Sequence, residues 1–135
     1  MSDVKQQLQV DAAGGKVLVT ITAENASGKP VFVPKAVYAA KQIMRREFVV
    51  KDMPGGTEVD YTGPMVKRGP FTKDDFVPLK PGQKLSHSID ITASYAFKPG
   101  HTYQIAYEGG YLADAAKVET VTPSAPAPVT FSFKK

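Results

Sequence analysis

The sequence predicts an all-β fold: an antiparallel sandwich of about seven to nine strands, forming a single domain over residues 1–135. Several segments alternate apolar and polar residues with a period of two, the pattern of strands with one buried face. They recur at roughly 10-residue spacing, with Gly, Pro and Asn turn signals between them. Only Lys35–Arg46 is rich enough in helix-favouring residues to hold a helical turn, and it is too short to change the class.

The expected strands follow one another along the chain. In residues 17–24, Val, Ile and Ala occupy every second position, and a turn is expected at 25–28. Residues 30–34 form a short extended segment with a proline at each end, which favours an edge or a strand end. A Pro/Ala-rich segment at 123–128 is expected to be a stiff connection into the last strand. The remaining strands are expected at residues 47–51, 57–61, 85–91, 103–107 and 129–133.

Tyr103 narrows the fold class. It stands at the start of an expected strand, two residues before the apolar Ile105. Immunoglobulin-like sandwiches place a corner tyrosine at this position, and its hydroxyl binds backbone in the preceding loop. The sequence therefore predicts an immunoglobulin-like antiparallel sandwich in which Tyr103 is buried and structural.

Composition excludes several classes of function. The chain has no cysteine, so it has neither disulfides nor thiolate metal sites, and its formal charge of +4 comes from basic residues interleaved with acidic ones. This dispersed charge argues against nucleic-acid binding. No apolar run reaches the roughly 20 residues that span a bilayer. The first ten residues lack the apolar core of a secretory signal, so we expect either a cytosolic protein or a chain that starts after a removed signal.

The sequence predicts no catalytic or metal site. His87 lies in an expected strand and His101 in an expected turn, so they do not form a clustered ligand set. No nucleophile elbow and no phosphate-binding loop is present. Asp74 and Asp75 form a lone carboxylate pair, which is usually solvated or caps a turn. We therefore expect a non-enzymatic protein with no cofactor and no metal requirement.

Exposed aromatic residues flanked by Arg or Lys are common anchors at protein interfaces. Tyr38, Phe71, Phe97 and Tyr111 lie in loop-like sequence and are expected to be exposed. Two segments combine such an aromatic residue with cations, at 38–46 and at 67–71. The predicted partner-binding residues are Lys67, Arg68, Phe71, Asp74, Asp75, Tyr38, Arg45 and Arg46.

Residues 16–108 resemble the amino-terminal pro-domain of the deuterolysin-type (aspzincin) zinc metallopeptidases. Those pro-domains run a Val-rich strand into an Asn-rich turn, followed by a Phe-x-Val strand, a Tyr-x-Gly-Pro-x-Val-Lys-Arg segment, a Leu-x-Pro-Gly turn and a strand leading to a Tyr. The order and spacing of these pieces carry the resemblance. The matching segments are Val19–Asn25, Phe48–Val50, Tyr61–Arg68, Leu79–Gly82, Ile89–Tyr95 and Gly100–Tyr103.

In that family a catalytic domain with a His-Glu-x-x-His helix follows the pro-domain, and this sequence contains no such motif. The resemblance therefore implies a free-standing pro-domain-like module, secreted or periplasmic, that inhibits or chaperones a metallopeptidase in trans. The alternative is a generic secreted or periplasmic sandwich used in surface assembly or carbohydrate contact. A small hydrolase is a weaker third option because no catalytic set is present. The sequence leaves the partner's identity and the oligomeric state open.

Overall fold

The computed structural model describes residues 4–39, 43, 47–53, 55–63, 72–107, 111–114, 121–122 and 125–133, and strands are their main secondary structure. Within these residues there are eleven strands: β1 (Val4–Asp11), β2 (Leu18–Asn25), β3 (Val31–Pro34), β4 (Val49–Met53), β5 (Thr57–Glu58), β6 (Phe76–Leu79), β7 (Lys84–Asp90), β8 (Thr102–Ala106), β9 (Tyr111–Leu112), β10 (Val121–Thr122) and β11 (Val129–Ser132). Three short helical turns accompany them: η1 (Ala13–Gly15), α1 (Lys35–Tyr38) and η2 (Lys73–Asp75).

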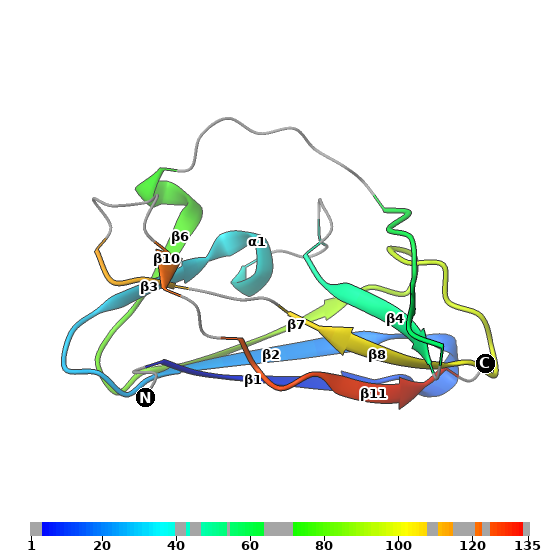
Figure 1. The fold of residues 1–135 in the computed structure, drawn as a ribbon. Coiled ribbons are helices and arrows are strands. Elements are labelled where there is room, and N and C mark those ends of the chain that lie inside the picture. Colours follow the sequence, from blue (N-terminus) through cyan, green and yellow to red (C-terminus); the bar gives the residue numbers. More distant parts are fainter. Residues whose placement is uncertain are drawn as a thin grey trace.

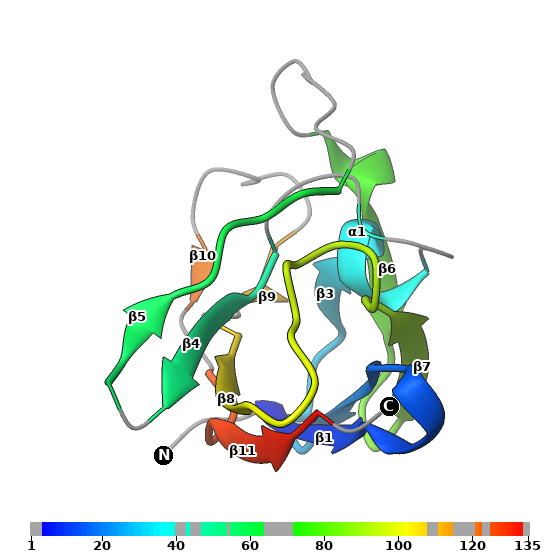
Figure 2. The same ribbon diagram turned by 90° about the vertical axis from the view of Figure 1, so that its right-hand side faces the viewer.

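The strands form three antiparallel sheets, in the orders β1-β2-β7, β11-β8-β4-β5 and β10-β9-β3-β6. The first two reproduce an immunoglobulin sandwich. Taken along the chain, β1, β2 and β7 occupy the places of strands A, B and E, and β4, β5, β8 and β11 those of C, C′, F and G. β11 lies beside β1, so the two sheets meet along one side of the sandwich (Figure 1, Figure 2). The all-β sandwich expected from the sequence is confirmed.

The third sheet is built from insertions into this frame. β3 and α1 come from the B–C connection, β6 from the C′–E connection, and β9 and β10 from the F–G connection. In Figure 2 the strands of this sheet appear from left to right as β10, β9, β3 and β6. Pro78 lies in β6, an edge strand, where the missing backbone N–H costs no sheet hydrogen bond. Three connections that are loops in a simple sandwich thus fold into one sheet.

Alternating side chains place the core between the sheets. In β2, Val19, Ile21 and Ala23 are fully buried, while Thr20 and Thr22 on the opposite face remain partly exposed. Strands β4 and β8 contribute buried residues to the same core, among them Val50 and Ile105. This is the period-two pattern on which the fold prediction was based.

Four strands were not expected from the sequence. β1 was missed because Gln6 interrupts the apolar series formed by Val4, Leu8 and Val10. β6, β9 and β10 are too short to show a clear alternation, and the latter two have two residues each. Eight of the eleven strands have four or more residues, which lies within the predicted range. Of the segment 35–46, expected to hold a helical turn, α1 covers Lys35–Tyr38.

Tyr103 forms the expected corner. Its side chain is buried, and its hydroxyl accepts a hydrogen bond of 2.7 Å from the backbone N–H of Lys98 in the preceding loop. The same hydroxyl lies 3.5 Å from the Lys98 carbonyl oxygen. Ile105, two residues later in β8, is fully buried. Both the burial and the backbone contact agree with the prediction, and they attach the loop before β8 to the sheet.

Replacing Tyr103 with phenylalanine should lower the free energy of unfolding by about 0.5–1.5 kcal/mol, the net value of one hydrogen bond. The ring remains to fill its space, so the loss reports the hydroxyl alone. Urea denaturation of the two proteins measures it. A midpoint equal to that of the unaltered protein would show that the corner bond contributes nothing.

Candidate functional site

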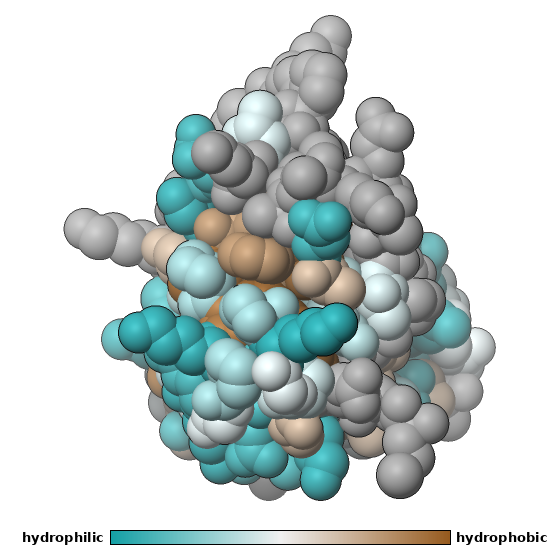
Figure 3. All heavy atoms as spheres, turned by 90° about the vertical axis from the view of Figure 1, so that its left-hand side faces the viewer, coloured by the Kyte–Doolittle hydropathy of each residue, from teal (hydrophilic) through white to brown (hydrophobic). Residues whose placement is uncertain are grey.

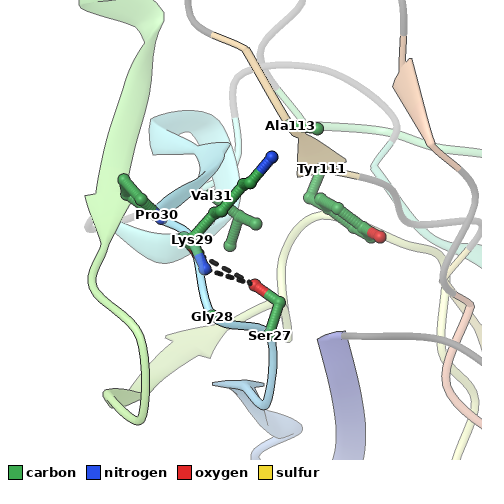
Figure 4. A pocket seen from close by; sticks show the side chains of 7 residues that line it. All are labelled: Ser27, Gly28, Lys29, Pro30, Val31, Tyr111 and Ala113. Carbon is green, nitrogen blue, oxygen red and sulfur yellow. Dashed lines mark hydrogen bonds between the residues drawn. The ribbon is translucent and has the colours of Figure 1, made fainter.

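A hollow opens between two of the insertions. The B–C insertion supplies its first wall, where β2 turns into β3, and the F–G insertion supplies the second, at β9. The hollow has a volume of about 400 Å³ and is open to solvent on one side. Figure 4 shows the side chains that line it: Ser27, Gly28, Lys29, Pro30, Val31, Tyr111 and Ala113.

Asn25 holds the turn that forms the first wall. It is fully buried, and its side-chain NH₂ donates to the carbonyl oxygens of Lys29 and Leu79 at 2.8 and 2.9 Å. Its side-chain oxygen accepts from the backbone N–H and the hydroxyl of Ser27 at 2.9 and 2.6 Å. One amide thus joins the end of β2, the turn and the end of β6. Because these bonds fix the backbone from both sides, the wall is formed before any ligand arrives.

Two polar groups at the hollow, the Lys29 ammonium and the Tyr111 hydroxyl, make no ion pair or hydrogen bond with the described residues. Within the part of the chain that the structure describes, the ammonium of Lys29 makes no ion pair. The ring of Tyr111 is buried, but its hydroxyl has no hydrogen-bond partner there and therefore reaches solvent, since no buried side-chain polar atom is left unpaired. Ser27 differs, because its hydroxyl already bonds within the turn.

The surface around this end of the molecule is mixed in character. Figure 3 shows the face that includes the turn between β2 and β3, with hydrophobic residues gathered in the middle and hydrophilic ones around them. An apolar centre with a polar rim is the usual composition of a protein-binding surface.

The structure describes three of the eight predicted partner-binding residues. Lys67, Arg68, Phe71, Arg45 and Arg46 lie outside the described residues. Asp74 and Asp75 belong to η2, where the Asp75 carboxylate accepts a 2.8 Å hydrogen bond from the backbone N–H of Thr72. Asp75 therefore caps a turn, as paired carboxylates in loops commonly do, while Asp74 is exposed.

The expected exposure of Tyr38 is wrong. Its side chain is only 3% exposed, and its hydroxyl donates a 2.6 Å hydrogen bond to the side-chain oxygen of Gln6 in β1. Burial raises the pKa of this phenol above its ordinary value, and the nearby Tyr107 adds to the effect. Tyr111 is likewise buried, and Phe97 is partly buried. Tyr38 contacts β1, the ring of Phe97 packs against Tyr103 and Phe133, and Tyr111 belongs to β9, so each of these residues packs against the fold.

The two histidines belong to different parts of the fold, and His101 has a carboxylate partner. His101 pairs with Asp52 at 2.9 Å between its ring Nδ1 and the carboxylate, and both side chains are substantially exposed. His87 lies in β7, whereas His101 lies in the loop just before β8. Among the described residues no group of three or more His, Asp or Glu is placed to hold a metal ion.

The outer face of the β1-β2-β7 sheet carries rows of neutral polar residues. Thr20 and Ser88 share a hydroxyl hydrogen bond of 2.7 Å, and Thr22 and Ser86 share one of 2.8 Å. The register continues each row into β1, with Gln9 opposite Thr20 and Gln7 opposite Thr22. These rows place hydroxyl and amide groups side by side on the outer face of the sheet.

Sequence reasoning missed the hollow. The segment Asn25–Gly28 was recognised as a turn, but nothing in it indicated that Tyr111, more than eighty residues later, would face it. The contact depends on the pairing of β3 with β9 through Phe32 and Leu112. Such a short bridge leaves no periodic signal in the sequence.

Comparisons with known proteins support the fold alone. No family model and no curated protein matches the chain. It is similar to the X-ray structure of the Northeast Structural Genomics Consortium target SoR45, with 13% identity, a TM-score of 0.50, and coverage of 96% of this chain and 83% of that one. It also matches the crystal structure of the yjhA protein from Bacillus subtilis, with 13% identity, a TM-score of 0.43, and coverage of 93% and 92%. The described residues include no helix long and apolar enough to cross a membrane.

Proposed function

We propose that this protein is a non-enzymatic protein-binding module that binds through the end of the sandwich where its B–C and F–G insertions meet. The main observation behind this proposal is the hollow between these insertions. The hydrogen bonds of the Asn25 side chain hold one of its walls in place. Immunoglobulin variable domains place their binding loops at the same end of the sandwich, in the same connections. A rigid frame that presents a concave surface with unpaired polar groups is suited to binding a ligand.

The resemblance supplies the partner class for this proposal. A deuterolysin-type metallopeptidase is the partner to test first, with the module acting in trans as an inhibitor or a chaperone. The choice of a metallopeptidase as the partner rests on the sequence segments quoted above. It does not depend on the hollow.

Titration of a purified aspzincin with the module tests the partner. We expect dose-dependent inhibition of peptide hydrolysis. Arg68→Ala combined with Phe71→Ala, in the segment that the sequence predicts as the interface with this partner, should weaken inhibition by about 2 kcal/mol or more, the usual threshold for residues that dominate an interface. Lys16→Ala is the matched control, because Lys16 is exposed and precedes β2 at the opposite end of that strand from Asn25, and it should leave inhibition unchanged. A module that neither inhibits the enzyme nor raises its refolding yield would remove the metallopeptidase from the proposal.

A second candidate, carbohydrate contact, is favoured by the outer face of β1, β2 and β7. Its rows of hydroxyl and amide groups match the hydrogen-bonding character of a polysaccharide chain. Affinity electrophoresis in gels that contain polysaccharide tests this candidate. Retardation that disappears when Thr22→Val and Ser86→Ala are combined would support it, and unretarded migration in every gel would exclude it.

A further inference from the structure

We infer that the hollow between the β2–β3 turn and β9 binds the C-terminal residue of a peptide, with an apolar side chain and a free carboxylate. The inference rests on the proposed protein-binding function and names the chemistry of the group recognised. It comes from the charges, the unpaired polar groups and the size of the hollow.

The charge of the hollow selects an anion. None of its seven lining residues is acidic, and Lys29 contributes the only formal charge among them. The ammonium of Lys29 has no ion-pair partner within the described chain. Asp114, which follows the lining residue Ala113, already has an interaction of its own. A carboxylate on the ligand would therefore meet an unpaired cation, and charge-assisted hydrogen bonds of this kind are about twice as strong as neutral ones.

The walls select an apolar body for the same ligand. Val31 and Pro30 line one side and the ring of Tyr111 lines another, and Figure 4 shows the Lys29 side chain running past Val31 toward Ala113. A volume of about 400 Å³ lies near the lower end of the range of about 300–1,000 Å³ typical of ligand pockets. This space admits one or two residues of an extended chain but no folded element.

The hydroxyl of Tyr111 is the second unpaired polar group at the hollow, and it recognises a part of the ligand other than the carboxylate. In Figure 4 the hydroxyl of Tyr111 points away from the Lys29 ammonium, so the two groups serve different parts of a ligand. Lys29 is placed for a terminal carboxylate, and Tyr111 for a main-chain carbonyl farther along the peptide. A small organic acid shares the carboxylate and the apolar body but lacks this second acceptor.

Fluorescence polarisation with labelled Ala-Ala-Ala-Ala-Leu tests the inference, because the same peptide can be made with a free carboxylate or a C-terminal amide. We expect the acid to bind about tenfold or more tightly than the amide. Lys29→Met, which keeps the length of the side chain, should abolish this difference. Lys80→Met is the matched control, since Lys80 is exposed outside the hollow, and it should preserve the difference. Equal binding of acid and amide, or no saturable binding of either, would overturn the inference.

Competition with 4-methylpentanoate distinguishes a peptide terminus from a small organic acid as the ligand, because both carry a carboxylate and an apolar body. We expect Tyr111→Phe to weaken the peptide several-fold while leaving the small acid unaffected. If the small acid competes as well as the peptide, a peptide terminus is not the ligand and the inference fails. Metallopeptidase inhibition without any peptide binding would overturn the inference and leave the proposed function standing. Peptide binding with neither inhibition nor a raised refolding yield would support the inference and remove the metallopeptidase.

Discussion

Replacing Asn25 with alanine is expected to lower the free energy of unfolding by about 2–4 kcal/mol, because one buried and several partly buried hydrogen bonds are lost together. The change leaves the carbonyl oxygen of Leu79 and the backbone N–H of Ser27 without the amide they now contact. The Lys29 carbonyl oxygen loses the amide as well, although the Ser27 hydroxyl still contacts it. Urea denaturation of the purified variant measures the loss.

Two further variants distinguish the contribution of the Asn25 side-chain amide to stability from that of the surrounding turn. Ser27→Ala removes one hydroxyl and should cost about 1 kcal/mol, the net value of a single bond. Asn25→Asp keeps the size and the acceptor but replaces the NH₂ donor with an oxygen that faces two carbonyl oxygens. This variant should therefore be destabilised at neutral pH even though it is nearly isosteric. Stability of the aspartate variant equal to that of the unaltered protein would show that the two donated bonds do not hold the turn.

The main strands of the sandwich could be predicted because their pattern of apolar and polar residues is visible within each short segment. In β2, Val19 and Ile21 face the core and Thr20 and Thr22 face outward, so the period of two is visible in the sequence alone. The corner at Tyr103 could be predicted for a similar reason, since its place two residues before Ile105 is a local pattern. Both features depend on residues that are close together in the chain.

The third sheet and the hollow could not be predicted, because they depend on pairings between distant and very short segments. β3 pairs with β9 through a single register position, Phe32 with Leu112. That bridge buries Tyr111 and brings it to the turn that follows β2. Tyr38 was expected on the surface for a similar reason. Its hydrogen-bond partner, Gln6, lies in β1, more than thirty residues earlier in the chain, and the sequence did not indicate this contact. Tertiary context decided exposure at each of these positions.

Phe97 shows the same effect in a loop and should give the second large loss of stability. It was expected to be exposed, yet its ring packs at the centre of an aromatic cluster. Its ring centroid lies 5.1 Å from that of Tyr103, in an edge-to-face arrangement, and 5.7 Å from that of Phe133. The rings of Tyr95 and Phe131 lie at 6.0 and 5.9 Å. One loop residue therefore joins the corner tyrosine to the end of the last strand.

We expect Phe97→Ala to reduce the free energy of unfolding by about 2–4 kcal/mol, somewhat below the loss for a fully buried phenylalanine because this side chain is only partly buried. The cost should exceed that of Tyr103→Phe, since a whole ring and four aromatic contacts are removed rather than one hydroxyl. Leu18→Ala is the control: Leu18 is 38% exposed, so its truncation should change stability by no more than about 0.5 kcal/mol. Chemical denaturation of the three variants gives the ranking. If Phe97→Ala and Leu18→Ala cost the same, the aromatic cluster does not hold the loop before β8, and the corner at Tyr103 must hold it alone.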